Sequence, residues 1–311
     1  MVSVILPVYN AQKTVKESIQ SIIDQTYKDW ELLVINDGST DNTKSEVLSF
    51  RDSRIKYIEN PENKKLIYTL NYGLELANGE YIARMDADDI SLPTRFEKQV
   101  SYMNKHPECV VCGTLIQRFK DKKNIGKPIG VIGDDVRLKE YLFRDACFMH
   151  PTVLFRADVV KKNKLKYNIN YLHAEDYKFW IDMSDYGEFH NLNEPLLKYR
   201  LSDGQISQIN KSVQFQTSNR CRQEYIKTKV KNNEKFLNEI ESGQISTGTL
   251  NQCKKINLKY YYLLEVLYLS MPTYGFKEIM YFFKSQDIFK ISFRTTLAFF
   301  KRIIKGKNSL L

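Results

Sequence analysis

Apolar runs of strand length recur along the first 90 residues, and stretches with helical periodicity lie between them. The runs are Val2–Val8 and residues 30–35, 55–58 and 81–85. The apolar residues at helical spacing are Val15, Ile19, Ile22 and Ile23, then Leu66, Leu70, Leu74 and Ala77. Strands that alternate with helices at this spacing predict right-handed βαβ units and a mostly parallel sheet flanked by helices.

Polar residues follow three of these apolar runs directly. Tyr9 and Asn10 follow the first run, Asn36 and Asp37 follow the second, and an acidic segment at residues 86–89 follows the fourth. Ligands of open α/β sheets bind outside the carboxyl ends of the strands. We therefore expect these polar residues to converge on one crevice.

The first of these turns excludes two common nucleotide-binding motifs. A dinucleotide fold needs G-x-G-x-x-G after its first strand, and a P-loop needs a glycine-rich loop that ends in Lys and Ser or Thr. Here the turn reads Pro7-Val8-Tyr9-Asn10-Ala11 and contains no glycine. A bound nucleotide would need another counter-charge for its phosphates.

The acidic segment offers such a counter-charge through a metal ion. Asp86, Asp88 and Asp89 place three carboxylates within four residues. Carboxylates this close repel one another unless they are solvated or share a hard divalent cation such as Mg²⁺ or Mn²⁺. An acidic solvated loop is the alternative, and the position at a strand end favours the metal site.

Residues 110–205 are less regular. We expect strands at 110–116, 150–156 and 194–200, a polar loop at 120–127, and a helix that opens at residues 174–180. Glu175 and Asp176 fall in the first turn of that helix, where the helix dipole stabilises a carboxylate. They could serve as a helix cap or as a general base over a cleft.

The net charge of +10 is concentrated near the carboxyl end of the sequence. Residues 254–311 hold eleven Lys or Arg against three acids, together with thirteen aromatic residues. Basic, aromatic helices suit an anionic membrane surface. A helical subdomain that packs its aromatics inward is an equal alternative. A nucleic-acid surface is disfavoured because no DNA- or RNA-binding motif accompanies the charge.

Composition narrows the class of protein further. The 311 residues are 42% hydrophobic and 27% charged, which excludes a disordered or collagen-like chain. No uncharged apolar run is long enough to span a membrane, and the first residues lack the features of a signal peptide. We therefore expect a cytoplasmic protein. The lone C-x-x-C at Cys109 and Cys112 has no second ligand pair for zinc, so we expect free, buried thiols.

The motifs together resemble family 2 glycosyltransferases of the GT-A fold, which build bacterial capsule, O-antigen and lipooligosaccharide chains. The matching segments cover about residues 1–205 in the family's order. They are Val4-Ile5-Leu6-Pro7-Val8-Tyr9-Asn10, Val34-Ile35-Asn36-Asp37-Gly38-Ser39, Arg84-Met85-Asp86-Ala87-Asp88-Asp89, His150-Pro151-Thr152, Ala174-Glu175-Asp176-Tyr177 and Tyr199-Arg200. Within the family, the sequence is most similar to β-1,3-N-acetylglucosaminyltransferases of lipooligosaccharide and capsule synthesis.

The resemblance implies a site for a UDP-sugar. Asp37 matches the position that hydrogen-bonds the uracil ring, and Pro7 and Tyr9 match residues that line the base pocket. Lys65 falls where similar enzymes place a basic residue near the nucleotide, although Lys64 also fits that position.

Two further groups of residues are implied in the same way. Asp86, Ala87 and Asp88 match the D-x-D segment that contacts the donor, with Asp88 the direct ligand of Mn²⁺ or Mg²⁺ and Asp86 its companion.

Asp176 matches the catalytic base, and Glu175 is its neighbour. His150 and Arg200 match recurrent positions near the acceptor and the diphosphate, where a structural role is equally open.

The implied protein is an inverting, metal-dependent glycosyltransferase, peripheral on the inner face of the cell membrane. It would transfer a sugar from a UDP-sugar, GlcNAc first and galactose or glucose next, to a lipid-linked oligosaccharide. We expect a nucleotide-sugar-binding half at residues 1–110, an acceptor-binding half at 111–205 and a helical, basic and aromatic region at 206–311 that binds an anionic membrane surface. We expect no nucleic-acid partner.

Two other classes of protein share parts of this pattern. A sugar-1-phosphate nucleotidyltransferase should carry a glycine-rich basic loop after its first strand, which is absent here. A non-catalytic nucleotide-sugar or membrane-surface binding protein should have lost some of Asp86, Asp88 and Asp176, and all three are present.

Overall fold

The computed structural model describes residues 1–201 and 211–229. Met1–Cys221 form one compact unit that contains the whole sheet, and only this unit is discussed below. Of the helical region expected at 206–311, the structure describes only α9 (Lys211–Lys229), and the basic, aromatic segment 254–311 lies outside the described residues. No helix in the described part combines the length and the apolar composition needed to cross a membrane.

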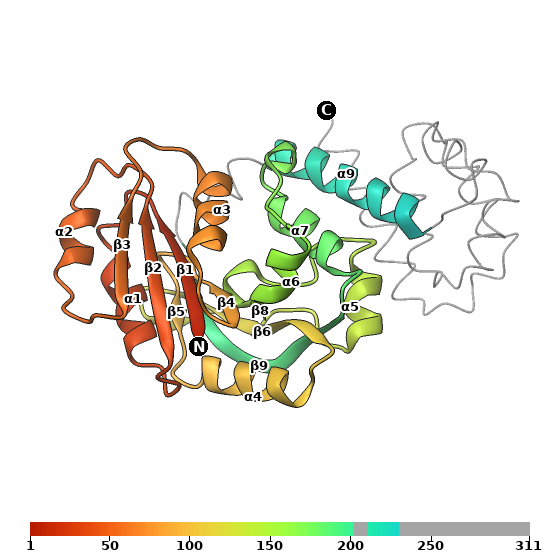
Figure 1. Ribbon diagram of the computed structural model, residues 1–311, viewed down its shortest axis with the longest axis horizontal. Helices are drawn as coiled ribbons and strands as arrows, with labels where there is room; N and C mark the ends of the chain where they lie inside the picture. The colour runs from red at the N-terminus through yellow and green to blue at the C-terminus, as the bar shows by residue number, and fades with distance from the viewer. Residues whose placement is uncertain (202–210, 230–311) are drawn as a thin grey trace, which may run out of the picture. The chain divides into compact units, whose positions relative to one another are not determined.

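A mixed sheet runs through this unit (Figure 1). In the described residues its order is β3-β2-β1-β4-β8-β6-β9-β5, with β7 paired to β6. The strands are β1 (Val2–Val8), β2 (Trp30–Asn36), β3 (Ile55–Glu59), β4 (Tyr81–Arg84), β5 (Ile90–Ser91), β6 (Cys109–Lys120), β7 (Lys123–Asn124), β8 (Leu154–Arg156) and β9 (Glu188–Arg200).

The first four strands form the parallel part of the sheet. β1 pairs in parallel with both β2 and β4, and β2 pairs in parallel with β3, so their carboxyl ends meet at one edge. β8 is antiparallel to β4 and β6, whereas β6 and β9 are parallel to each other. The predicted α/β fold with a mostly parallel sheet is confirmed, with antiparallel pairing confined to β5, β7 and β8.

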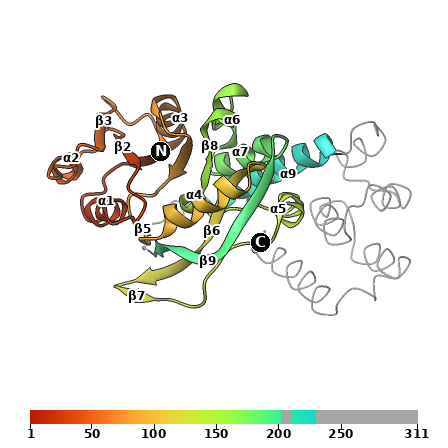
Figure 2. The same cartoon turned by 60° about the horizontal axis from the view of Figure 1, so that its bottom comes forward.

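Helices cover both faces of the sheet. They are α1 (Val15–Ile23), α2 (Thr43–Leu48), α3 (Leu66–Leu76), α4 (Arg95–Lys105), α5 (Asp135–Tyr141), α6 (Ala157–Lys162) and α7 (Glu175–Met183). Single 3₁₀ turns stand at η1 (His150–Thr152) and η2 (Ile169–Tyr171). Figure 2 shows α4 lying along β6 and β9.

Alternate residues of β1 serve the two faces, as expected for a buried strand. Val4 and Leu6 belong to a core cluster with apolar residues of α1 and α4. Ile5 points the other way, toward Gly73 of α3, where its Cγ2 lies 2.6 Å from the position of an added Cβ. β1 is therefore covered on both sides, which explains its continuous apolar run.

The structure corrects the expected elements at several places. The polar loop expected at 120–127 contains β7, which pairs with the end of β6 as a hairpin. The strand expected at 150–156 is a 3₁₀ turn followed by the shorter β8, since Pro151 has no N–H to donate to a ladder. The strand expected at 194–200 begins earlier, at Glu188.

Cys109 and Cys112 lie on β6 as buried, free thiols, which confirms that interpretation. Burial raises the pKa of the Cys109 thiol to about 12, which keeps it protonated. The only group of His, Cys, Asp or Glu side chains positioned to hold a metal among the described residues is the acidic segment at 86–89.

Gly79 allows a close approach between two strands of the sheet. Helix α3 ends at Leu76, and Gly79 instead lies against the start of β1. Its N–H donates to Ser3 Oγ at 2.7 Å, and an added Cβ would stand 2.7 Å from Ser3 N and 2.8 Å from the Met1 carbonyl oxygen. Only glycine allows the chain to enter β4 this close to β1.

We expect Gly79→Ala to destabilise the fold by about 1–3 kcal/mol, because its Cβ would press on backbone atoms that cannot rotate away. Thermal and denaturant unfolding measure this change. Asn78→Ala is the matched control, since its exposed side chain contacts only the Leu76 carbonyl at 3.1 Å. Equal stability of the two variants would contradict the close approach.

Candidate active site

The acidic segment forms a tight turn between β4 and β5. One carboxylate oxygen from each of Asp86, Asp88 and Asp89 lies within 4.8 Å of the others. The first two side chains are partly exposed, whereas Asp89 is buried. The structure thus gathers the three carboxylates at the carboxyl end of β4, as the sequence predicted.

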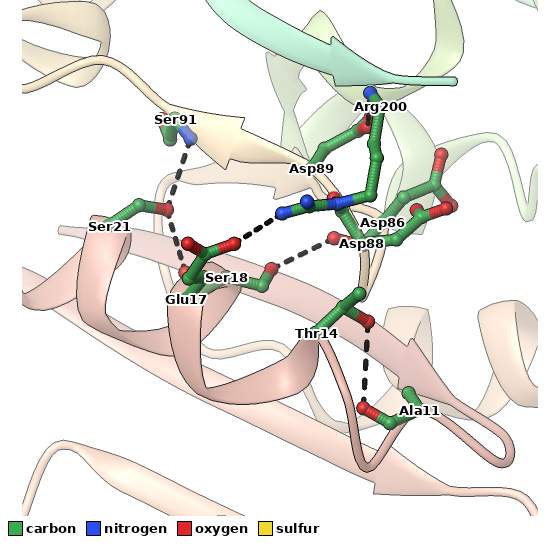
Figure 3. A network of polar contacts seen from close by, with 10 residues as sticks. All are labelled: Ala11, Thr14, Glu17, Ser18, Ser21, Asp86, Asp88, Asp89, Ser91 and Arg200. Atoms are coloured by element: carbon green, nitrogen blue, oxygen red, sulfur yellow. Dashed lines mark hydrogen bonds and ion pairs between the residues drawn. The ribbon is translucent and has the colours of Figure 1, made fainter. Parts of the chain in front are cut away.

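Helix α1 holds this turn from one side (Figure 3). Ser18 Oγ donates to the Asp86 carbonyl at 2.9 Å, and the Ser91 N–H donates to Ser21 Oγ at 3.0 Å. Both serines are buried on the helix face that otherwise carries apolar residues. They fix the two ends of the acidic turn against the helix.

Arg200, at the end of β9, holds the turn from the other side. Its backbone N–H donates to Asp89 Oδ1 at 2.9 Å, and its Nε donates to the Asp88 carbonyl at 2.7 Å. Its guanidinium also pairs with Glu17 of α1 and lies over the Phe119 ring, 4.6 Å from the centroid. The structure therefore places Arg200 at the acidic turn, where it contacts the backbone carbonyl of Asp88 and not its carboxylate (Figure 3).

The three carboxylates repel one another because they lie close together. Burial, together with the negative charge of Asp86, raises the pKa of Asp88 to about 6. Burial and the charges of Asp86 and Asp88 also raise the pKa of Asp89. Asp89 Oδ2 is buried and has no hydrogen-bond partner within the described residues. A divalent cation would relieve this repulsion, and three oxygen donors at this spacing fit Mg²⁺ or Mn²⁺.

The Glu175–Asp176 pair opens α7, as predicted. Glu175 is buried, and its Oε2 has no hydrogen-bond partner in the described part of the chain. Asp176 is partly exposed, and its Oδ1 accepts from the Tyr177 N–H at 2.8 Å. Burial and the charge of Glu175 raise the pKa of Asp176 to about 7. A carboxylate with such a pKa is poised to accept a proton near neutral pH.

The charge of one buried arginine acts on both the acidic turn and the Glu175–Asp176 pair. Arg84 ends β4 and is 4% exposed. Burial raises the pKa of Asp88, Glu175 and Asp176, and the charge of Arg84 acts against that increase in all three. Both groups of carboxylates thus lie within the field of the same guanidinium.

His150 lies beside this arginine. Its Nε2 is 3.1 Å from the Tyr167 hydroxyl, and its ring meets Trp180 of α7 edge-on at 6.0 Å. Burial and the charge of Arg84 lower the pKa of His150 well below its ordinary value, so the imidazole is neutral at neutral pH. The histidine therefore packs on α7 through Trp180, beyond the first turn of that helix.

Asp37 orders the loop between β3 and α3. Its Oδ1 accepts from Asn60 Nδ2 and the Lys64 N–H, both at 2.8 Å, and its Oδ2 accepts from the Lys65 N–H at 2.9 Å. Each carboxylate oxygen accepts about two hydrogen bonds, so one position on Oδ2 remains for a ligand donor.

The two lysines differ in a way that the sequence left open. Lys64 pairs with Glu62, whereas Lys65 makes no ion pair within the described residues. Lys65 has a φ of 74°, a strained conformation for a residue with a side chain. Pro7 is partly buried in β1 beside Ile35, and Tyr9 stands 49% exposed directly after that strand.

Sequence reasoning gave no role to three residues of this site. They are Arg84, Tyr167 and Tyr199; burial raises the pKa of both tyrosines, and the acidic side chains around them raise it further. Arg84 carried a readable signal, since it is a charge inside the apolar run at residues 81–85. Tyr167 carried none, because only the folding of the chain brings it to His150.

The family of this protein follows from its sequence relatives. The family model for glycosyl transferase family 2 matches residues 3–164. An uncharacterized glycosyltransferase of Haemophilus influenzae is 35% identical over 99% of this chain and 98% of its own length. The chain belongs to glycosyl transferase family 2.

Two further comparisons extend this result. The Escherichia coli UDP-Glc:α-D-GlcNAc-diphosphoundecaprenol β-1,3-glucosyltransferase WfgD is 32% identical over 67% of this family 2 chain and 79% of its own length. The crystal structure of Staphylococcus aureus TarS 1-349 in complex with UDP-GlcNAc superimposes with a TM-score of 0.57 at 17% identity, over 86% of this chain and 81% of TarS 1-349. The protein is thus a glycosyltransferase with the GT-A fold.

We expect Asp37→Asn to destabilise this glycosyltransferase by about 1–3 kcal/mol, because an amide cannot accept all three hydrogen bonds and leaves a buried donor unpaired. Thermal unfolding measures the loss, and faster amide exchange at Lys64 and Lys65 locates it. The control is Asp24→Asn, an exposed carboxylate that accepts from Gln20 Nε2 at 2.8 Å. Unchanged exchange at the two lysines would show that Asp37 does not order the loop.

Proposed function

We propose that this chain is an inverting, metal-dependent glycosyltransferase that transfers GlcNAc from UDP-GlcNAc to a hydroxyl of a lipid-linked cell-surface oligosaccharide. The new linkage has the β configuration. The observation that carries the proposal is the cluster of three carboxylates at the end of β4, bound by Arg84, whose charge also acts on Asp176. A cation-binding group and a candidate base within one electrostatic field are what a single displacement at a sugar diphosphate requires.

The donor assignment rests on the residues after β1 and β2. Asp37 keeps one acceptor position for the uracil imide, and a charge-assisted hydrogen bond there favours uracil over other bases. Pro7 and Tyr9 line the base pocket, and Lys65 approaches the diphosphate. The TarS complex supports UDP-GlcNAc as a ligand of this fold. The full name of WfgD gives UDP-Glc as its donor, which favours a β-glucosyltransferase as the second candidate. A β-galactosyltransferase is the third.

Asp86 and Asp88 hold the divalent cation, Mn²⁺ or Mg²⁺, beside the Ala87 backbone. A cation bound there would supply positive charge against the leaving diphosphate. Arg200 and the two serines of α1 keep the turn in the shape that presents these carboxylates. The protein contributes a fixed turn, so little reorganisation accompanies the departure of the nucleotide.

Asp176 is the general base. It takes the proton of the acceptor hydroxyl on a carboxylate oxygen while that hydroxyl attacks the anomeric carbon from the face opposite the diphosphate. General-base help of this kind contributes roughly 10²–10⁴-fold to the rate. Glu175 adds negative charge that makes Asp176 a better proton acceptor.

The acceptor is placed at the inner face of the cell membrane. WfgD acts on a diphosphoundecaprenol-linked sugar, which supports a lipid-linked acceptor for this relative. The basic, aromatic region at 206–311 would then bind the anionic membrane surface, with residues 1–110 holding the donor and residues 111–205 the acceptor.

We expect Asp176→Asn to retain UDP-sugar binding and to lose transfer by at least about 10²-fold, because the amide cannot accept the acceptor proton. Calorimetry with UDP measures binding, and a coupled UDP-release assay with acceptor measures turnover. Asp182→Asn on the same helix is the control, since that carboxylate pairs with Lys178. Surviving transfer with weakened UDP binding would overturn the assignment of the base.

The donor is tested with a panel of UDP-, dTDP- and GDP-sugars, each with and without Mn²⁺. We expect UDP-GlcNAc to be turned over fastest, only with the cation, and the product linkage read by NMR to be β. Asp88→Ala should abolish the dependence of donor binding on Mn²⁺. Preference for a dTDP- or GDP-sugar would refute the donor, and metal-independent transfer would refute the cation site.

A further inference from the structure

Arg84 grips one of the proposed metal ligands with two nitrogens. Its Nη1 bonds Asp86 Oδ2 and its Nη2 pairs with Asp86 Oδ1, so the guanidinium engages both carboxylate oxygens. Two-point pairing of this kind is the strongest form of the Arg–carboxylate contact. The Asp86 carboxylate is therefore directed at an internal cation.

Arg84 is also held from behind. Its N–H donates to the Val153 carbonyl at 3.3 Å, and its own carbonyl accepts from Arg95 Nη2 at 3.2 Å. Its Nε is buried and has no hydrogen-bond partner among the described residues. The backbone of Arg84 is thus fixed, while its side chain binds Asp86 and keeps a buried Nε–H that is not used in that contact.

The backbone of Arg84 is linked through Val153 to the elements that carry the candidate base. Val153 directly follows η1, which bears His150, and the His150 ring contacts Trp180 of α7. The Tyr167 ring stacks on Phe179 of the same helix at 4.3 Å. This chain of contacts joins the end of β4 to the helix that begins with Glu175.

We propose that Arg84 is a positioning residue that competes with the divalent cation for Asp86. The inference rests on the proposed function and adds an order of events to it. With Asp86 already neutralised, the acidic turn alone is a weak cation site. The cation then binds well only together with the donor diphosphate, whose oxygens supply the missing charge and ligands.

Removal of Arg84 should therefore strengthen the cation site. An opposite charge at this range changes a carboxylate's ligand affinity by about tenfold or more. We expect Arg84→Gln to bind Mn²⁺ in the absence of UDP at least about tenfold more tightly than the parent chain. Arg84→Lys keeps a point charge but loses the two-point grip, so its affinity should fall between the two.

Calorimetric titration of Mn²⁺ into the full chain, with and without UDP, measures these affinities. Arg156→Gln is the matched control, since Arg156 lies opposite Tyr81 at the amino end of β4 and its guanidinium donates to the carbonyls of Cys109 and Met103. We expect that variant to bind Mn²⁺ as the parent does. Melting temperatures show whether each variant is folded.

The pH profile of transfer gives a second measurement. The charged and titratable groups that act on Asp176 are Glu175, Arg84, Asp145, Tyr167 and Cys147. Transfer requires ionised Asp176, so the rate should rise with pH through about 7. Arg84→Gln removes a charge that lowers the pKa of Asp176, so this limb should move to higher pH, and Arg84→Lys should restore it.

The outcomes separate the inference from the function on which it rests. A folded Arg84→Gln protein that binds Mn²⁺ no more tightly than the parent overturns the role of Arg84 and leaves the glycosyltransferase proposal standing. If Arg84→Gln fails to fold, Arg84→Lys decides, since its affinity must still exceed that of the parent. Absence of Mn²⁺ binding in every protein, even with UDP, would overturn the cation site and the competition together.

Discussion

Repulsion among three carboxylates in one tight turn is the constraint on which this structure depends. Asp86, Asp88 and Asp89 lie within 4.8 Å of one another and are partly or fully removed from water. Such a cluster persists only if positive charge stands beside it and its backbone cannot open. Arg84 supplies the charge from β4, and Arg200 together with α1 closes the backbone.

The positive charge that the acidic turn requires also acts on the second group of carboxylates in the site. The arginine that neutralises the acidic turn is buried, so its charge is poorly screened and reaches the Glu175–Asp176 pair as well. Both groups of carboxylates then respond to the same positive charge. In the proposed reaction, departure of the diphosphate and removal of the acceptor proton belong to one displacement.

Much of this arrangement was predictable from local pattern. The four parallel strands follow from continuous apolar runs, and the polar residues at their ends were expected to converge because parallel strands end at one edge. Asp37, Asp86, Asp88 and Asp176 were each named from sequence, and the structure places the last three around Arg84. The short β7 and β8 were not anticipated, since two or three residues carry no periodicity.

The sequence by itself determined the βαβ order, the acidic turn and the family, because these depend on residues close together in the chain. Only the tertiary structure decided that the charge of Arg84 acts on both groups of carboxylates, that Tyr167 reaches His150 and that Gly79 contacts β1. Tyr167 lies 17 positions from His150 and Gly79 lies 76 positions from Ser3, so no local pattern pairs them. Local sequence pattern indicates which side chains are buried, whereas only tertiary packing determines which residues they contact.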